Sequence, residues 1–136
     1  MINYFYLAKI KSEVCQYNTS IKEFIKRLNN SKYLFQIIID ENKKFLGTVT
    51  DGDVRRFLIK HDINQENLKK LINTKSIYGY INEDTKNINK IKKLSKVTRS
   101  LIDFIPILDK EKKVKKILIL DQNNKLNNFA SFIFAG

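Results

Sequence analysis

Hydrophobic positions along the chain change from helical spacing to strand-like runs, and this change predicts a mixed α+β fold. The apolar side chains of residues 19–28 fall on one helical face, so this stretch predicts a helix. The isoleucine-rich stretch 35–40 predicts a buried strand, and the charged turn 41–44 leads into a partner strand at 45–50. The first part of the chain is therefore expected to hold a helix followed by a β-hairpin.

Helical spacing returns after the hairpin. A second helix is expected from Gly52 to about Lys60, and it carries Val54, Phe57 and Leu58 on its inward face. Residues 64–72 predict a further short helix or helical turn.

The second half of the chain repeats the first at an offset of 69 residues. This offset aligns Phe35 with Phe104 and Asp40 with Asp109, and it also aligns two turn lysines in each half. The second half should therefore have its own hairpin at 104–109 and 114–120. It should also have its own helix, whose inward face would carry Ile88, Ile91, Leu94 and Val97.

Pro106 falls inside the first strand of the second hairpin. A proline there predicts an edge position or an irregular start of the strand, because it has no N–H for a ladder hydrogen bond. Each half would be marginally stable alone, so two repeats that share one core are expected.

Polar side chains gather where the strand 45–50 runs into the next helix. Thr50 and Asp53 are expected one helical turn apart, and Asp51 is expected to cap the helix. A hydroxyl suits a phosphate oxygen, and a carboxylate accepts hydrogen bonds from the two hydroxyls of a ribose. The free N–H groups of the first helical turn attract anions, and Arg55 and Arg56 add two guanidinium groups. These residues predict a nucleotide site, although a capped helix accounts for them as well.

The stretch from Gly47 to Asp53, which includes Gly52, resembles the glycine, strand and Ser/Thr-x-x-Asp signature of CBS domains. These are paired nucleotide-sensing modules, and a pair is called a Bateman module. The resemblance implies an α+β (α/β-like) fold of two intertwined β-α-β-β-α repeats sharing one core, at residues 1–70 and 71–122. It also implies that Thr50 contacts phosphate and Asp53 contacts ribose, with AMP, ADP or ATP as the regulatory ligand.

The second repeat has lost the polar groups of this signature. At the same offset, its glycine, threonine and aspartate are replaced by Lys116, Ile119 and Gln122. One ligand site is therefore expected, held by the first repeat. An apolar wall for the base is expected from the second repeat, formed by Ile105, Pro106 and Ile107.

Residues 129–136 form an apolar run that is similar to the first strand of sugar-1-phosphate nucleotidyltransferases. CBS pairs whose signature reads Thr-Asp-Gly-Asp, a hydrophobic residue and two arginines occur N-terminal to such enzymes. The resemblance implies that residues 123–136 are a linker and the start of a truncated nucleotidyltransferase domain. The 136 residues hold no complete catalytic set, so the fragment itself is expected to be inactive.

Composition narrows the remaining possibilities. Only four of the 26 basic residues behind the net charge of +12 are arginines, so solvated lysines are expected rather than a nucleic-acid-binding face. The single cysteine, Cys15, excludes an internal disulfide and fits a reducing compartment, so a cytoplasmic protein is expected.

No apolar run is long enough to span a membrane. An EF-hand starting at Asp51 has the wrong spacing, and no metal site is expected.

Two functions of different classes remain. The intact first signature favours a regulatory nucleotide-binding module, whereas the degenerate second signature favours a ligand-free CBS pair that only dimerises its parent enzyme. A homodimer is expected, because the stripe of Val54, Phe57 and Leu58 need not be fully covered within one chain.

Overall fold

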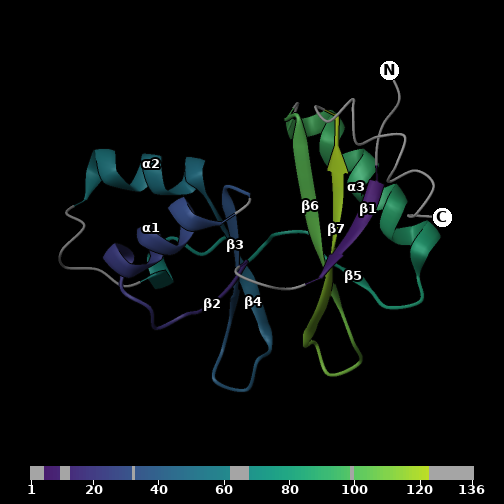
Figure 1. The fold of residues 1–136 in the computed structure, drawn as a ribbon, viewed down its shortest axis with the longest axis horizontal. Helices are drawn as coiled ribbons and strands as arrows, with labels where there is room; N and C mark the ends of the chain where they lie inside the picture. Colours follow the sequence, from purple (N-terminus) through teal and green to yellow (C-terminus); the bar gives the residue numbers. More distant parts are fainter. Residues whose placement is uncertain (1–4, 10–12, 32, 62–67, 99, 123–136) are drawn as a thin grey trace. The chain divides into compact units, whose positions relative to one another are not determined.

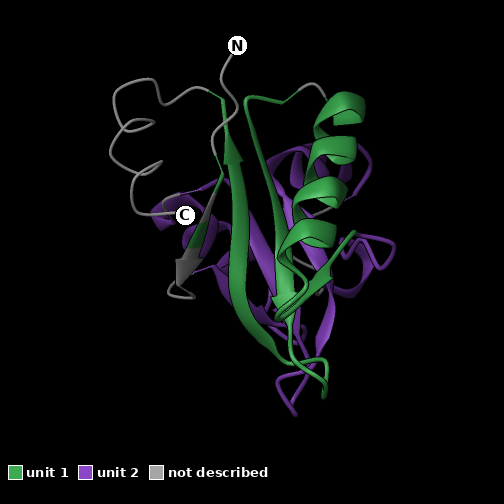
Figure 2. Cartoon of the chain, turned by 90° about the vertical axis from the view of Figure 1, so that its right-hand side faces the viewer, with its two compact units in different colours: residues 1–9, 77–136 green, residues 10–76 purple. Residues whose placement is uncertain are grey.

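A computed structural model describes residues 5–9, 13–31, 33–61, 68–98 and 100–122 (Figure 1). The chain divides into two compact units, residues 10–76 and residues 1–9 with 77–136, which Figure 2 shows in different colours. The mixed α+β class predicted from the hydrophobic pattern is confirmed. No helix within the described residues is long and apolar enough to cross a membrane.

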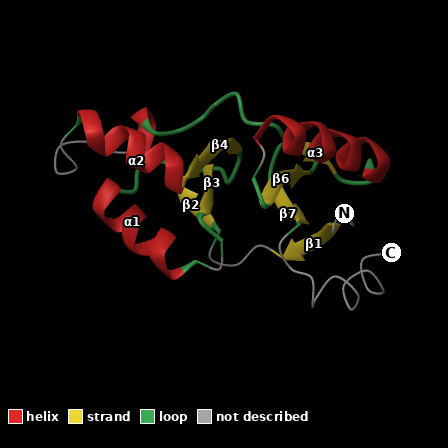
Figure 3. Cartoon of the chain, turned by 90° about the horizontal axis from the view of Figure 1, so that it is seen from above, coloured by secondary structure: helices red, strands yellow, loops and turns green. Residues whose placement is uncertain are grey.

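The unit of residues 10–76 packs two helices on a three-stranded sheet. Its strands are β2 (Val14–Gln16), β3 (Phe35–Ile39) and β4 (Phe45–Thr50), with β3 in the middle, parallel to β2 and antiparallel to β4. Helices α1 (Ile21–Asn30) and α2 (Asp51–Lys60) lie on the same side of this sheet (Figure 3), and η2 (Leu68–Lys70) is a short 3-10 helix. The core between helices and sheet contains Ile21, Phe24, Leu28, Ile38, Val49, Val54, Phe57 and Leu68.

The other unit packs one helix on a four-stranded sheet. The strand order is β1 (Phe5–Lys9), β7 (Val114–Asp121), β6 (Ile102–Leu108) and β5 (Gly79–Tyr80), and α3 (Asp84–Thr98) lies alongside β6 and β7. Its core contains Ile91, Ile105, Ile107, Leu118 and Leu120. The N-terminal strand β1 thus joins the sheet of the second half, antiparallel to β7.

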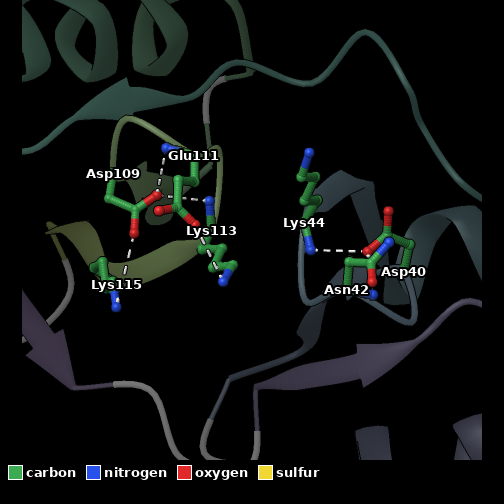
Figure 4. Close-up of polar contacts among 7 residues, drawn as sticks. All are labelled: Asp40, Asn42, Lys44, Asp109, Glu111, Lys113 and Lys115. Carbon is green, nitrogen blue, oxygen red and sulfur yellow. Dashed lines mark hydrogen bonds and ion pairs between the residues drawn. The ribbon is translucent and has the colours of Figure 1, made fainter.

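The predicted internal repeat is confirmed residue by residue in the two hairpins. Phe35 pairs with Thr50 and Phe104 pairs with Ile119, and each hairpin has its register shift at the equivalent place, after Ile38 or Ile107. The turns match as well, because Lys43 and Lys112 both have positive φ values, of 65° and 64°. In each turn one aspartate Oδ1 accepts two backbone N–H groups (Figure 4).

Pro106 lies within β6, and the shortness of β5 explains how the sheet accommodates it. In the first repeat, the N–H of Ile37 donates to the Glu13 carbonyl at 2.7 Å, where β2 begins to pair with β3. Pro106 is the equivalent of Ile37 and has no N–H to donate. Pairing between β5 and β6 accordingly begins one residue later, at Ile107. On the β5 side, Pro106 therefore lies just before the paired stretch, at a local edge of the sheet, as predicted.

Two details of the predicted helices are wrong. Val97 is 82% exposed and does not join the core, although Leu94, one turn earlier on α3, packs against it. In α2, Val54 and Phe57 are buried within their own unit, and only Leu58 of the predicted stripe is exposed, at 42%.

Some predictions lie outside what the structure describes. The helical turn predicted at 64–72 is described only from residue 68 onward, and the predicted linker and strand at 123–136 fall outside the described residues. The repeat boundaries 1–70 and 71–122, and a core shared between the repeats, stay predictions, since each unit is described by itself.

Candidate functional site

The junction of β4 and α2 brings Thr50 and Asp53 into direct contact. Thr50 has extended backbone angles (φ −109°, ψ 167°), and its side-chain oxygen accepts a hydrogen bond from the Asp53 N–H at 3.2 Å. In return, Asp53 Oδ2 accepts from the Thr50 N–H at 2.8 Å and from the Thr50 hydroxyl at 3.0 Å. This reciprocal arrangement is a capping box, which satisfies free N–H groups at the start of a helix.

The prediction that Asp51 caps this helix is wrong, because Thr50 is the cap and Asp51 is the first helical residue. A capping residue must keep extended angles while its side chain reaches back to the third helical residue, and Thr50 meets both conditions. Asp51 instead forms an ion pair with Arg55 one turn further along the helix.

A second arginine, Arg56, forms an ion pair with Asp53. Arg56 Nη2 lies 2.6 Å from Asp53 Oδ1, so the carboxylate accepts three hydrogen bonds in total. The Arg56 side chain is 72% exposed whereas that of Asp53 is 23% exposed, so the pair lies at the surface with its acid partly covered. Gly52 adjoins this pair, since a Cβ added there would lie 3.3 Å from Arg56 Nη1.

The junction could bind two kinds of polar group on a ligand, hydroxyls and an anion. An ionised carboxylate has room for about four hydrogen bonds, so Asp53 can accept one more, or two if Arg56 moves away. The N-terminal end of α2 carries partial positive charge, and two arginines reinforce it. A hydroxyl pair and an anion could therefore be held side by side, although the capping box also stabilises α2 without any ligand.

The structure brings six of the nine predicted site residues together at this junction and places the other three elsewhere. Ile105, Pro106 and Ile107 lie on β6, in the other compact unit. Ile105 is fully buried and Ile107 is 3% exposed, and both pack in the core against Ile91. Core packing thus accounts for their apolar character, and their role as a wall for a base stays a prediction.

Three features of the structure were not predicted from the sequence. Asn87 is buried on α3 and bonds both to the Tyr80 N–H (3.2 Å) and to the Tyr80 carbonyl (2.8 Å), which ties the helix to β5. Asp103 is 5% exposed and accepts from the Thr98 hydroxyl at 2.7 Å, and burial raises the pKa of its carboxyl above the ordinary 3.8. Nothing in the local spacing signals either burial.

The third feature is a cavity of about 380 Å³ in the unit of residues 10–76. Its lining comprises Tyr17, Asp40, Leu46, Lys69, Ile72 and Thr74. The sequence contained one hint that the two repeats differ at this place: at the offset of 69 residues, Leu46 of the first repeat aligns with Lys115 of the second.

Other groups with potential chemistry have simple structural roles. Cys15 is buried at 3% exposure, and its Sγ lies 3.2 Å from the Thr19 hydroxyl oxygen. Among the described residues no cluster of three or more His, Cys, Asp or Glu side chains could hold a metal ion.

Comparison with known proteins supports the CBS resemblance. Residues 10–60 match the family model of the CBS domain, a segment that contains the whole Thr50–Asp53 junction. No curated protein matches the sequence.

Several solved structures share the fold. The CBS domain pair of protein MJ0100, in complex with 5′-methylthioadenosine and S-adenosyl-L-methionine, is 18% identical with a TM-score of 0.67, and the match covers 92% of this chain and 93% of that one. The CBS-pair protein CBSX2 from Arabidopsis thaliana is 16% identical with a TM-score of 0.66, covering 96% and 95%. The cytosolic domain of the Mg²⁺ channel MgtE, in complex with ATP, is 16% identical with a TM-score of 0.57, covering 76% of this chain and 40% of that one. At these identities the likeness shows the fold.

Proposed function

We propose that this chain, with its CBS domain at residues 10–60 and the fold of CBS-pair proteins, is a regulatory module that binds an adenine nucleotide at the Thr50–Asp53 junction. The observation that carries the proposal is the contact between the Thr50 hydroxyl and the Asp53 carboxylate, 3.0 Å apart at the start of α2. The ligands named for two proteins of the same fold, ATP and S-adenosyl-L-methionine, share an adenosine group, which suits this pair of side chains.

In the proposed complex, the ribose hydroxyls donate to Asp53 and displace Arg56 from Oδ1. The released guanidinium, being exposed and adjacent, then pairs with a phosphate oxygen, where a charge-assisted bond is favourable. The Thr50 hydroxyl and the N–H groups at the start of α2 complete the phosphate contacts. The second repeat offers no equivalent, since Ile119 replaces the threonine and is fully buried.

Calorimetric titration of the purified chain with AMP, ADP, ATP and adenosine tests this proposal. Asp53→Ala should weaken nucleotide binding by about 1–3 kcal/mol, the cost of leaving polar groups of the ligand unpaired. Thr50→Val should weaken AMP binding more than adenosine binding, because it removes a contact to phosphate.

A matched control exists in α1, where Ser20 caps the helix and accepts from the Glu23 N–H at 3.2 Å. Ser20→Ala removes a helix cap of the same kind but should leave nucleotide affinity unchanged. Equal affinity in Asp53→Ala and the unsubstituted chain would contradict the proposed site.

A ligand-free dimerisation module is the second candidate. It is favoured by the capping box, which gives Thr50 and Asp53 a complete structural role, and by the exposure of Leu58 and Ile59 on α2, at 42% and 83%. Absence of a melting-temperature shift with every adenine nucleotide, together with a dimer in sedimentation, would favour this candidate.

The parent protein is proposed to be a sugar-1-phosphate nucleotidyltransferase. This part of the proposal rests on the sequence of residues 129–136 and on the Thr-Asp-Gly-Asp signature followed by two arginines. Reading the gene beyond Gly136 tests it directly. A glycine-rich loop with an arginine immediately downstream would support the assignment, and its absence would remove it.

A further inference from the structure

The cavity in the unit of residues 10–76 lies at the hairpin-turn end of β4, away from the Thr50–Asp53 junction. Leu46, in the cavity wall, is the second residue of β4, whereas Thr50 is the last. The volume of about 380 Å³ falls within the range of roughly 300–1,000 Å³ that binding pockets occupy. The cavity is therefore large enough to admit a side chain from another molecule.

Each hairpin contains a β-bulge at the same place, and the bulged residue differs between the two. In the first hairpin the pairing shifts between Ile38 and Ile39, which leaves Leu46 without a cross-strand partner. In the second hairpin the same shift leaves Lys115 without one. Leu46 and Lys115 are therefore equivalent by backbone pairing as well as by the offset of 69 residues.

The bulged lysine reaches a carboxylate that the bulged leucine cannot satisfy. Asp40 and Asp109 each hold their turn with Oδ1, as Figure 4 shows. Oδ2 of Asp109 lies 3.7 Å from the Lys115 ammonium. The pKa of the Asp109 carboxyl is lowered, chiefly by the hydrogen bond from the Lys113 N–H and in part by the charge of Lys115. None of the described residues forms a hydrogen bond or ion pair with Asp40 Oδ2.

The rest of the cavity wall suits the aliphatic stem of a lysine. Leu46 and Ile72 present apolar surface. Lys69 lies in the same wall, but its ammonium lies over the ring of Tyr17, 5.4 Å from the ring centroid, and has further interactions of its own. No ion pair joins Lys69 to Asp40. The Asp40 carboxylate therefore lies beside apolar surface and receives no cation from the described part of the chain.

We propose that this cavity is a docking site for a lysine side chain of a partner protein. The ammonium would pair with Asp40 Oδ2, as Lys115 pairs with Asp109, and the aliphatic stem would pack on Leu46 and Ile72. The second repeat thus carries within its own chain the group that the first repeat takes from a partner. An anion would be repelled by Asp40, and an uncharged apolar chain would leave the carboxylate unpaired.

The test is an NMR titration of the full chain with blocked glycyl-lysyl-glycine, followed at the amide resonances of Leu46, Ile72 and Thr74. Two matched peptides accompany it. Norleucine in place of lysine keeps the stem and lacks the ammonium group, and Nε-acetyl-lysine keeps the stem and loses the charge. The lysine peptide should give saturable shifts, and each matched peptide should bind at least about fivefold more weakly, because each leaves the Asp40 charge unpaired.

Variants then separate charge from packing, with dispersed amide spectra as the check that each is folded. Leu46→Lys supplies the ammonium within the chain and should weaken binding of the lysine peptide at least about tenfold. Leu46→Met is the matched control, unbranched but uncharged, and should bind the peptide within about twofold of the unsubstituted chain. Asp40→Asn keeps Oδ1 as the acceptor for the turn and removes the charge, so it should lose the preference for lysine over norleucine.

Several results would overturn the proposal. Equal binding of the lysine and norleucine peptides, or unchanged binding to Leu46→Lys, would show that Asp40 does not recognise the ammonium group. An equal loss in Leu46→Met and Leu46→Lys would assign the effect to packing. Absence of a saturable shift in the unsubstituted chain would remove the site, and tighter binding of n-butylamine than of the lysine peptide would make it a site for a small amine.

Discussion

Thr50→Val should destabilise the protein through the start of α2. Valine keeps the shape of threonine but removes the hydroxyl that accepts from the Asp53 N–H at 3.2 Å and donates to Asp53 Oδ2 at 3.0 Å. The second half of the capping box, the 2.8 Å bond from the Thr50 N–H to Asp53, survives the substitution. Loss of an N-cap side chain typically costs about 1 kcal/mol, which for a chain of this size lowers the melting temperature by about 4 °C.

Urea denaturation followed by far-UV circular dichroism measures this cost as a fall in the unfolding free energy with an unchanged m-value. Thr50→Ser is the matched control, because it keeps the hydroxyl and should stay within about 0.5 kcal/mol of the unsubstituted chain. If Thr50→Val were as stable as the unsubstituted chain, or if Thr50→Ser lost as much stability, the capping box would not stabilise α2 as argued.

Three further predictions concern the rest of the structure. Gly47→Ala should destabilise by about 1–3 kcal/mol in urea denaturation, because its Cβ would overlap the backbone carbonyl of Asn73. Gly52→Ala is its control and should cost nothing or stabilise slightly, because its Cβ would approach closely only the far end of the Arg56 side chain and would meet the Thr50 hydroxyl at an ordinary 3.8 Å. Asp103→Asn should gain stability relative to the unsubstituted chain as the pH rises from about 4 to 7. The raised pKa of the folded carboxyl favours folding at low pH and opposes it once the buried group must ionise, so a pH-independent difference would contradict this reasoning. The chain should be a homodimer in sedimentation equilibrium, and Leu58→Glu should weaken the dimer if α2 forms the contact.

Local spacing in the sequence was sufficient to predict the hairpins, the internal repeat and the pairing of Thr50 with Asp53. The hairpins and the Thr50–Asp53 pair depend on contacts between residues that lie close together in the chain, such as the turn in which Asp40 Oδ1 accepts from the Lys44 N–H. The repeat is the same local pattern occurring twice. Hydrophobic periodicity also identified the inward face of α1 and, on α2, the buried residues Val54 and Phe57, because burial on one face requires apolar residues every three or four positions.

The choice between Thr50 and Asp51 as the helix cap needed backbone angles, because both residue types cap helices well. The exposure of Val97 also came only from the structure, since helical spacing marks a candidate inward face but does not show which of its positions the sheet covers.

Only the tertiary structure decided which distant residues meet. Phe5 pairs with Leu120 in the sheet, Asp103 is buried at the start of β6, and the cavity draws on Asp40 and Lys69 from separate elements. Such contacts depend on how whole elements pack, and many packings are compatible with the same local pattern. The burial of a charge or the opening of a cavity is therefore a property of the packed unit, which no stretch of the sequence carries by itself.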